Sequence, residues 1–142
     1  MTKSKIDPQT FDIPDGFVHW PGDPAEDNLG PFFYRIAENE CQSALRLRSN
    51  HCNIYGNTHG GILMALADYT LGLTAIADTD EMWVTVTCNN EFIAGSKAGE
   101  LIIGTGELLR RTRSLAFVRA TLRVDERVLL TASGVFKKVR AG

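Results

Sequence analysis

Two adjacent glycines, Gly60 and Gly61, separate a polar segment from an apolar run in the middle of the sequence. Asn57 and Thr58, just before them, are residue types that favour the N-cap position, so a helix is predicted to start here. The first N–H groups of a helix have no partner within the helix and lie at its positive end. Glycines at that point let a substrate approach the backbone closely. The segment is therefore suited to holding an anion or a developing oxyanion.

Asp68 is the only charged residue between Arg48 and Asp78, and it falls inside the predicted helix. It is either an ordinary carboxylate, partly exposed or hydrogen-bonded, or a catalytic one whose burial would require partners and shift its pKa. Asp68 follows Gly61 by seven residues, so the two share a helix face but lie about 10 Å apart along the axis. One helix cannot bring both to one scissile bond. Two helices packed antiparallel about a two-fold axis would bring them together, so the spacing predicts a symmetric dimer.

The elements that must position these residues follow from periodicity. The helix is predicted over about residues 60–77, and it is apolar on nearly every side, so a sheet is expected to wrap it. Apolar and β-branched runs predict strands at about 33–37, 41–48, 83–93, 100–110, 114–124 and 128–136, with a turn at 38–40. Short turns favour an antiparallel meander, in which Gly104 and Gly106 predict a bend or bulge. Together they predict an α+β fold, with one long central helix wrapped by a curved antiparallel sheet of about five to six strands.

All five prolines fall within residues 1–31, where regular structure is expected to be sparse. The same segment carries Phe11, Phe17 and Trp20, which are too apolar for a free tail. We expect an irregular Pro-rich N-terminal arm that packs on the body, with a short helix after Asp23. The arm either lines or covers a site, or is surface padding. Residues 32–142 are expected to form a single domain.

The composition argues against several classes of protein. The net charge of −2 gives no strong attraction to nucleic acid or to an anionic membrane, and no apolar run is long enough for a membrane span. The polar start lacks the core of a signal peptide. Cys41, Cys52 and Cys88 are scattered, which indicates reduced thiols in place of a disulfide framework or a zinc site. We therefore expect a cytoplasmic protein without a metal.

The order of the elements resembles the hotdog fold, and more narrowly that of the PaaI/THEM2-like acyl-CoA thioesterases. The resemblance covers about residues 32–138. Its motif is N-x-x-G-x-x-H-G-G followed by an acid, formed here by Asn53, Gly56, His59, Gly60, Gly61 and Asp68. Two more segments match: 84–86, where the family has a strand with a Ser or Thr near the site, and 113–117, which is similar to its basic-hydroxyl-apolar hairpin strand.

The resemblance implies a mechanism for hydrolysing an acyl-CoA or aryl-acyl-CoA to the free acid and CoA. The backbone N–H of Gly60 or Gly61 would polarise the thioester carbonyl. Asp68 of the partner subunit would activate a water as general base, or attack as nucleophile. No metal and no separate cofactor are needed, because coenzyme A is part of the substrate.

Three more residues receive roles from the resemblance. Thr85 would help to hold the water, Asn53 would position Asp68 or the thioester, and His59 would lie near the sulfur. For Asn53 and His59 the alternative is hydrogen bonding within the loop. For Thr85 the alternative is an ordinary strand position, because Thr is common in strands.

The family also binds the nucleotide end of CoA on its surface, often across subunits. Candidate phosphate contacts are Arg111, Arg113, Lys97, Lys137 and Lys138, each of which could instead be a solvated surface charge. Tyr69, Leu73 and the aromatic residues of the arm could line a pocket for an aryl or a medium aliphatic acyl group. The arm is not part of the shared core, so the acyl specificity of the family does not transfer. Family members assemble as two dimers, so a homotetramer is expected.

Two other functions fit the same residues. A hotdog hydratase or dehydratase would need a His and a carboxylate, such as His59 and Asp68, at an acyl Cα–Cβ bond; the glycine pair fits carbonyl polarisation better. A non-catalytic acyl-CoA-binding protein would bind CoA esters without turnover.

Overall fold

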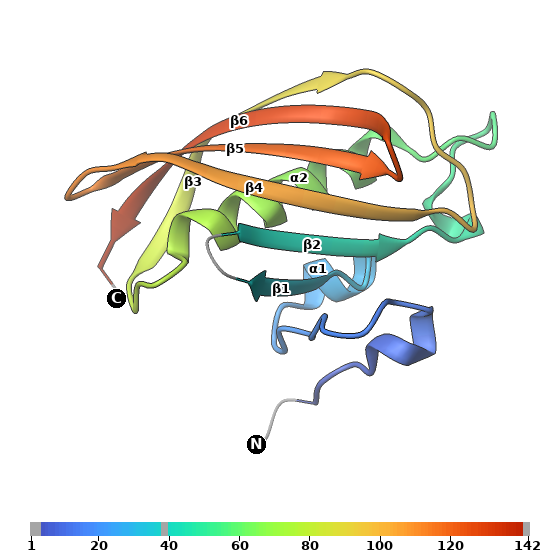
Figure 1. Cartoon of the computed structure of the whole chain (residues 1–142), viewed down its shortest axis with the longest axis horizontal. Helices are drawn as coiled ribbons and strands as arrows, with labels where there is room; N and C mark the ends of the chain where they lie inside the picture. The colour runs from blue at the N-terminus through green and yellow to red at the C-terminus, as the bar shows by residue number, and fades with distance from the viewer. Residues whose placement is uncertain (1–3, 38–39, 141–142) are drawn as a thin grey trace.

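A computed structural model describes residues 4–37 and 40–140, so the predicted turn at Glu38 and Asn39 lies outside the described residues. Within these ranges one long helix, α2 (Gly60–Ile76), lies under a curved sheet of six antiparallel strands (Figure 1). The strands are β1 (Phe33–Ala37), β2 (Glu40–Arg46), β3 (Met82–Phe92), β4 (Leu101–Arg111), β5 (Leu115–Val124) and β6 (Arg127–Val139). These layers confirm the predicted α+β class. No helix among the described residues is long and apolar enough to cross a membrane.

The strand order is β1-β2-β4-β5-β6-β3, and every neighbouring pair is antiparallel. The predicted meander is correct for β4, β5 and β6 but wrong for β3, which lies beside neither β2 nor β4. The reason is the connection through α2, which passes beneath β4, β5 and β6 and contacts all three. The chain therefore emerges at the far edge of the sheet, where β3 pairs with β6, and returns through β4 to pair with β2.

The main core lies between α2 and the sheet. Leu66 and Leu71 of α2 are fully buried against Ile102, Leu122 and Leu129, which point inward from three different strands. The helix is buried on most of its surface, as its nearly continuous apolar sequence predicts. Because α2 is buried in this way, the positions of the other elements depend on it.

Gly104 and Gly106 allow α2 to approach β4 closely. A Cβ atom on Gly106 would overlap the hydroxyl of Thr74, a residue of α2. The predicted bend or bulge at this glycine pair is wrong, because the register shift in β4 falls between Leu108 and Arg110. Packing against the helix requires a residue without a side chain at this position. Strand propensity alone does not reveal that requirement.

Hydroxyl groups complete the contact between the helix and the sheet. Ser43 Oγ of β2 lies 2.7 Å from Thr70 Oγ1, which also donates to the carbonyl of Leu66 at 2.7 Å. Thr74 Oγ1 donates to the carbonyl of Thr70 at 2.8 Å. All of these hydroxyls are buried, and each has a partner, so the polar groups at this interface are satisfied.

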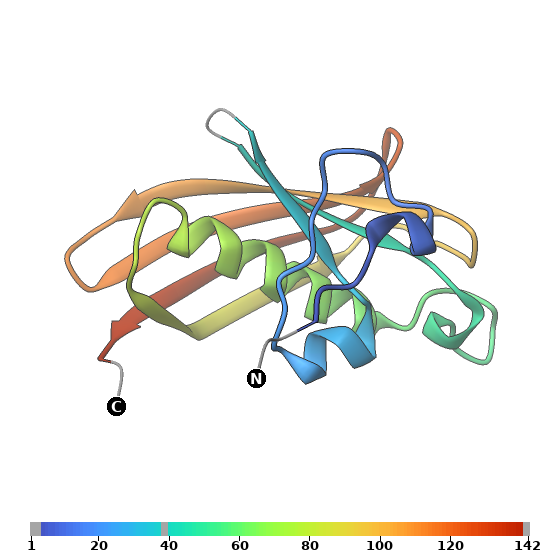
Figure 2. The same ribbon diagram turned by 90° about the horizontal axis from the view of Figure 1, so that it is seen from below.

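The N-terminal arm wraps around the β1 edge of the sheet (Figure 2). Its first part contains a 3₁₀ helix, Pro8–Phe11, and its Ile13 and Phe17 pack with Phe33 on the sheet face opposite α2. Val18 then pairs with Tyr34 of β1. The arm continues to the other face, where the short helix expected after Asp23 is present as α1 (Pro24–Leu29), in contact with α2.

His19 fixes the two halves of the arm to each other. It is almost fully buried, and its Nδ1 accepts a hydrogen bond from the N–H of Ile6 at 3.0 Å. Its Nε2 lies 2.7 Å from the carboxylate of Asp27 in α1. The arm is therefore an ordered part of the fold despite its prolines.

The substitution Gly106→Ala is expected to lower the free energy of unfolding by about 1–3 kcal/mol, because the added methyl group forces α2 away from β4. Urea unfolding of both proteins measures the difference. Gly72→Ala is the matched control: its Cβ would meet the Phe136 ring at 3.6 Å, an ordinary contact, and Ala in a helix interior favours folding by up to about 1 kcal/mol. Equal stability of Gly106→Ala and the wild type would contradict the close-approach argument.

Candidate active site

The start of α2 carries the first half of the site. The helix begins at Gly60, and its N-cap is His59, not Asn57 or Thr58 as predicted. The imidazole of His59 takes the capping role because its Nδ1 accepts a hydrogen bond from the N–H of Gly61 at 2.9 Å. The Gly61 N–H is therefore occupied, whereas the Gly60 N–H has no acceptor among the residues that the structure describes. Gly60 offers the available donor at the positive end of the helix.

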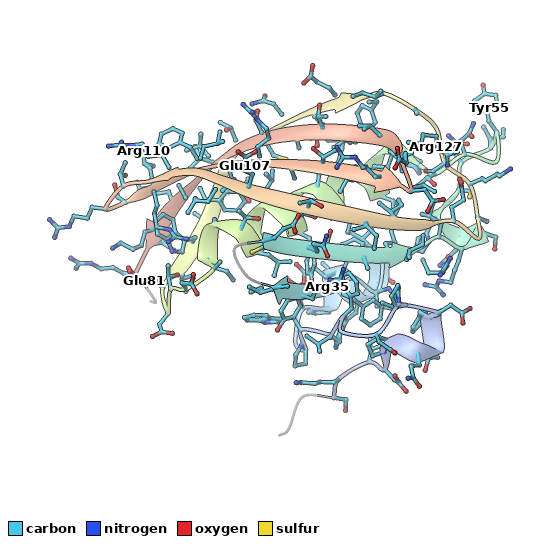
Figure 3. All side chains as sticks on the ribbon, viewed as in Figure 1. Arg35, Tyr55, Glu81, Glu107, Arg110 and Arg127 are labelled. Carbon is cyan, nitrogen blue, oxygen red and sulfur yellow. The ribbon has the colours of Figure 1, made fainter. Side chains whose placement is uncertain are left out.

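The loop before α2 is held by its own side chains. Asn53 Oδ1 accepts hydrogen bonds from the N–H groups of Tyr55 at 2.9 Å and Asn57 at 3.2 Å. Asn53 thus shapes the loop, and within one chain no hydrogen bond links it to Asp68, whose positioning was one of its predicted roles. At the tip of the loop Tyr55 is 85% exposed and projects from the molecule (Figure 3).

His51 was not predicted as a structural residue, yet it joins this loop to the arm. Its Nδ1 accepts from the N–H of Arg48 at 2.9 Å, so the proton is on Nε2, which donates to the carbonyl of Gly30 at 3.1 Å. Burial lowers the pKa of His51, which keeps the ring neutral. Its carbonyl in turn accepts the N–H of His59 at 2.8 Å, so the buried ring supports the residue that caps the helix.

Asp68 and Thr85 form the second half of the site. Asp68 is exposed on the middle of α2, and its Oδ1 accepts a hydrogen bond of 2.8 Å from the Thr85 hydroxyl on β3. The resemblance implies that Thr85 helps to hold the water; in this structure its hydroxyl donates to the carboxylate that would activate that water. One carboxylate oxygen is fixed in direction, and the second, Oδ2, has no protein partner among the described residues. Such a carboxylate can accept a proton from a water.

A cleft of about 640 Å³ lies beside Asp68 and Thr85. One wall comes from the arm, and the others come from α2, β3 and β6. The lining includes Trp20, Glu26, Tyr69, Leu73, Trp83 and Phe136. The arm therefore lines a cleft next to the carboxylate, in line with the first of the two roles considered for it. A larger hollow of about 900 Å³ near Ile36 and Thr74 includes neither Asp68 nor Gly60 in its lining.

Tyr69 is 7% exposed and packs its ring 5.3 Å from that of Phe32. Its hydroxyl is buried and has no hydrogen-bond partner among the described residues, and the same is true of the indole N–H of Trp83. Burial raises the pKa of Tyr69 far above its usual range, and the charge of Glu26 adds to the effect. The hydroxyl thus stays protonated, and it is an unsatisfied polar group of a residue that lines the cleft.

Glu26 brings a second carboxyl group to the cleft. Burial raises the pKa of Glu26 to about 7, with further contributions from the negative charges of Asp23, Asp27 and Asp68. Sequence reasoning missed this residue, because Glu26 lies in the arm and its acidic neighbour Asp68 is far away in the chain. The only available signal was an acid-rich helix start after Asp23.

Arg111, one of the predicted phosphate contacts, binds the end of α2 in this structure. Its Nη2 donates to the carbonyls of Ala75 at 2.8 Å and Ala77 at 3.0 Å, at the C-terminal end of α2. Its guanidinium carbon lies 6.0 Å from the centre of the Trp83 ring. Because a helix ends with unpaired carbonyls and partial negative charge, the guanidinium stabilises the end of α2 there.

The remaining predicted phosphate contacts do not gather at one place. Lys97 precedes β4 and Arg113 follows it, and the eleven residues of β4 span about 35 Å. Figure 3 shows the two ends of the sheet, with Arg110 at one and Arg127, which pairs with Glu100, at the other. Lys137 and Lys138 lie at the Arg113 end, and Lys138 forms an ion pair of 2.8 Å with Glu81. One bound CoA cannot contact both ends of a single chain.

Comparison with known proteins gives consistent matches. A family model described as the thioesterase superfamily matches residues 55–131. A proposed esterase of Pseudomonas aeruginosa, PA0474, is 34% identical over 130 residues, which cover 89% of this chain and 97% of that protein. The structure of PaaI from the phenylacetic acid degradation operon of Escherichia coli superimposes with a TM-score of 0.77 at 15% identity, covering 84% of this chain and 87% of that one. A Streptococcus pneumoniae thioesterase with coenzyme A gives 0.70 at 19% identity, with 76% and 85% covered. These likenesses confirm the expected hotdog fold.

The substitution Glu26→Gln is expected to change how stability depends on pH. In the folded protein Glu26 keeps its proton up to about pH 7, whereas an unfolded glutamate loses it near about pH 4.3. Between these values the folded state binds more protons, so raising the pH lowers the free energy of unfolding of the wild type. Gln cannot ionise, so the wild type should lose stability relative to the variant from about pH 4 to about pH 7. Urea unfolding at fixed protein concentration measures this, and parallel pH profiles would show that Glu26 ionises normally.

Proposed function

We propose that this chain, which belongs to the thioesterase superfamily, hydrolyses acyl-CoA thioesters at sites shared by two copies of the chain. Membership of the family supports thioester hydrolysis. The observation that carries the finer proposal is the hydrogen bond from Thr85 to Asp68 beside the cleft. It gives the cleft an oriented carboxylate, which thioester hydrolysis requires. The acyl group would occupy the cleft between the arm and α2.

The proposed mechanism uses two polar groups. The Gly60 N–H donates to the thioester carbonyl oxygen and stabilises the negative charge that develops on it. The Asp68 carboxylate takes a proton from water as the water oxygen bonds to the carbonyl carbon. When the tetrahedral intermediate collapses, the carbon–sulfur bond breaks and the CoA thiolate leaves, taking up the proton that Asp68 accepted. Direct attack by Asp68 would use the same residues. No step needs a metal or a separate cofactor.

The two groups must come from different copies of the chain. Gly60 and Asp68 are eight residues apart on α2, which is about 12 Å along the helix axis and too far for one thioester group. The edge strand β3 supports pairing between copies, because its outer edge is open and it exposes Val84, Val86 and Phe92. A two-fold dimer would bring Asp68 of one copy to Gly60 of the other. We further propose that two such dimers form a tetramer. We also propose a cytoplasmic location, which is in line with the three free cysteines.

A CoA substrate is favoured by the coenzyme A in the Streptococcus pneumoniae thioesterase of the same fold. Lys97 is the best-placed candidate for a phosphate contact near the Gly60 end. It follows Ser96, whose hydroxyl donates to Thr58 Oγ1 at 2.8 Å and whose carbonyl accepts the Thr58 N–H. Lys97 is therefore attached to the segment that leads into α2. Arg113 and Lys137 lie at the opposite end of the sheet. They would contact a phosphate at this site only if a second copy brought that end of its own sheet close.

The substitution Asp68→Asn tests the chemistry. Asn keeps an oxygen that accepts the Thr85 hydroxyl but cannot take a proton, so kcat should fall by about 10²–10⁴-fold. Release of free thiol is measured from acetyl-, medium-chain, long-chain and aryl-acetyl-CoA esters. Esters that bind without release from the wild type would leave a non-catalytic binding protein. Hydration of crotonyl-CoA without thiol release would identify a hydratase.

Mixing two inactive variants tests the shared site. Gly60→Pro removes the N–H while keeping the helix, because Pro fits the first helical position and His59, at φ −62° and ψ 132°, suits a residue before proline. The other variant is Asp68→Asn. In mixed dimers one site receives both intact groups, so random re-association should restore about a quarter of wild-type activity. A mixture as inactive as its components would show that each site is built from one chain.

A further inference from the structure

We propose that Glu26, contributed by the N-terminal arm, selects the charge of the acyl group: uncharged acyl groups are accepted, and acyl groups that end in a carboxylate are excluded. This inference rests on the proposed function, because it names the class of substrate that the cleft beside Asp68 would take. It concerns the arm, which lies outside residues 55–131, the part of the chain that the family model matches.

The lining of the cleft is acidic. It contains Asp23, Glu26, Asp68 and Glu81, and no Lys, Arg or His side chain among the residues described. Glu81 is paired with Lys138 at 2.8 Å. Asp68 accepts a hydrogen bond from the hydroxyl of Thr85 at 2.8 Å. Glu26 lies in the wall of the cleft that comes from the arm. Its side chain has no hydrogen-bond or ion-pair partner in the described parts of the chain.

The groups that face Glu26 come from two elements, α1 with its N-cap and α2. Asp23 and Asp27 are its neighbours at α1, and Asp27 is bound by His19. From α2, the charge of Asp68 further raises the pKa of Glu26. Among the charged groups, Glu26 contributes most to raising the pKa of Tyr69, which is also on α2. No positive charge among these groups compensates Glu26. An anionic acyl group would therefore have to approach Asp68 and Glu26 without a counter-ion in a partly desolvated space.

Tyr69 gives an independent sign that the cleft receives a ligand. Its side chain is more than nine-tenths buried, it lines the cleft, and its hydroxyl is unpaired. A buried polar group without a partner is costly, and a ligand that bonds to it recovers that cost. An uncharged acyl group with a hydroxyl at its far end would satisfy Tyr69 without meeting the repulsion that a carboxylate meets. The cleft volume of about 640 Å³ is in the range of small-molecule sites.

The test compares three esters of equal chain length: hexanoyl-, 6-hydroxyhexanoyl- and adipoyl-CoA. The readout is the ratio of kcat/KM for adipoyl-CoA to that for hexanoyl-CoA. Since both esters are hydrolysed by the same chemistry, any effect of pH on that chemistry cancels in this ratio. Burial raises the pKa of Glu26 to about 7, so Glu26 is mostly neutral at about pH 6 and mostly ionised at about pH 8. The wild-type ratio should therefore fall about tenfold between these values.

The variant Glu26→Gln should show a ratio that does not change with pH and exceeds that of the wild type about tenfold at the higher pH. Glu126→Gln, in the exposed turn between β5 and β6, removes the same charge away from the cleft and should behave as the wild type. Tyr69→Phe should reduce the preference for 6-hydroxyhexanoyl-CoA over hexanoyl-CoA. Hydrolysis of hexanoyl-CoA with the same ratio at both pH values and in Glu26→Gln would overturn the charge selection alone. Release from none of the esters would overturn the proposed function and the selection with it.

Discussion

The close contact between α2 and β4 is the constraint on which the other parts of this molecule depend. Gly106 has no side chain at the point where Thr74 meets the strand, and buried hydroxyls link Ser43 to Thr70 across the same contact. With the helix fixed at this depth, its N-terminal end, the carboxylate of Asp68 and the edge strand β3 have defined relative positions. Arg111 fixes the other end of the helix through the last carbonyls. The reactive groups are thus carried on a rigid element, as precise positioning requires.

The helix and the strands could be predicted from the sequence because each has its own periodicity, which local residues determine. The place of β3 could not, since it depends on where α2 leaves the sheet, a long-range property. The motif indicated His59, Gly60 and Asp68, but it did not indicate which N–H stays free. That depends on His59 Nδ1 taking the N–H of Gly61, a choice of side-chain rotamer. The contact of Arg111 with the end of α2 could not be foreseen for a related reason, because a surface charge and a helix-capping charge look alike in a sequence.

The acids of the cleft differ because their surroundings differ. Asp68 is exposed and held by a hydroxyl, an arrangement that supports a carboxylate able to receive a proton. Glu26 is half-buried among other acids, which favours its neutral form. Two identical functional groups in one cleft can therefore take different tasks, one in chemistry and one in recognition. The second group comes from the Pro-rich arm, the part of the chain for which the family resemblance made no prediction.

The pairing of Val18 with Tyr34 has a consequence for growth of the sheet from one molecule to the next. At Tyr34 both backbone groups of β1 that face outward are already bonded to Val18, at 2.8 Å and 2.9 Å. Exposed strand edges invite pairing with other chains, and a molecule with two open edges can polymerise without limit. Here the arm occupies the β1 edge at Tyr34, and among the described residues no strand lies beside the outer edge of β3. If two copies paired through β3, each would use its open edge, and the arm would hinder further growth of the sheet at Tyr34.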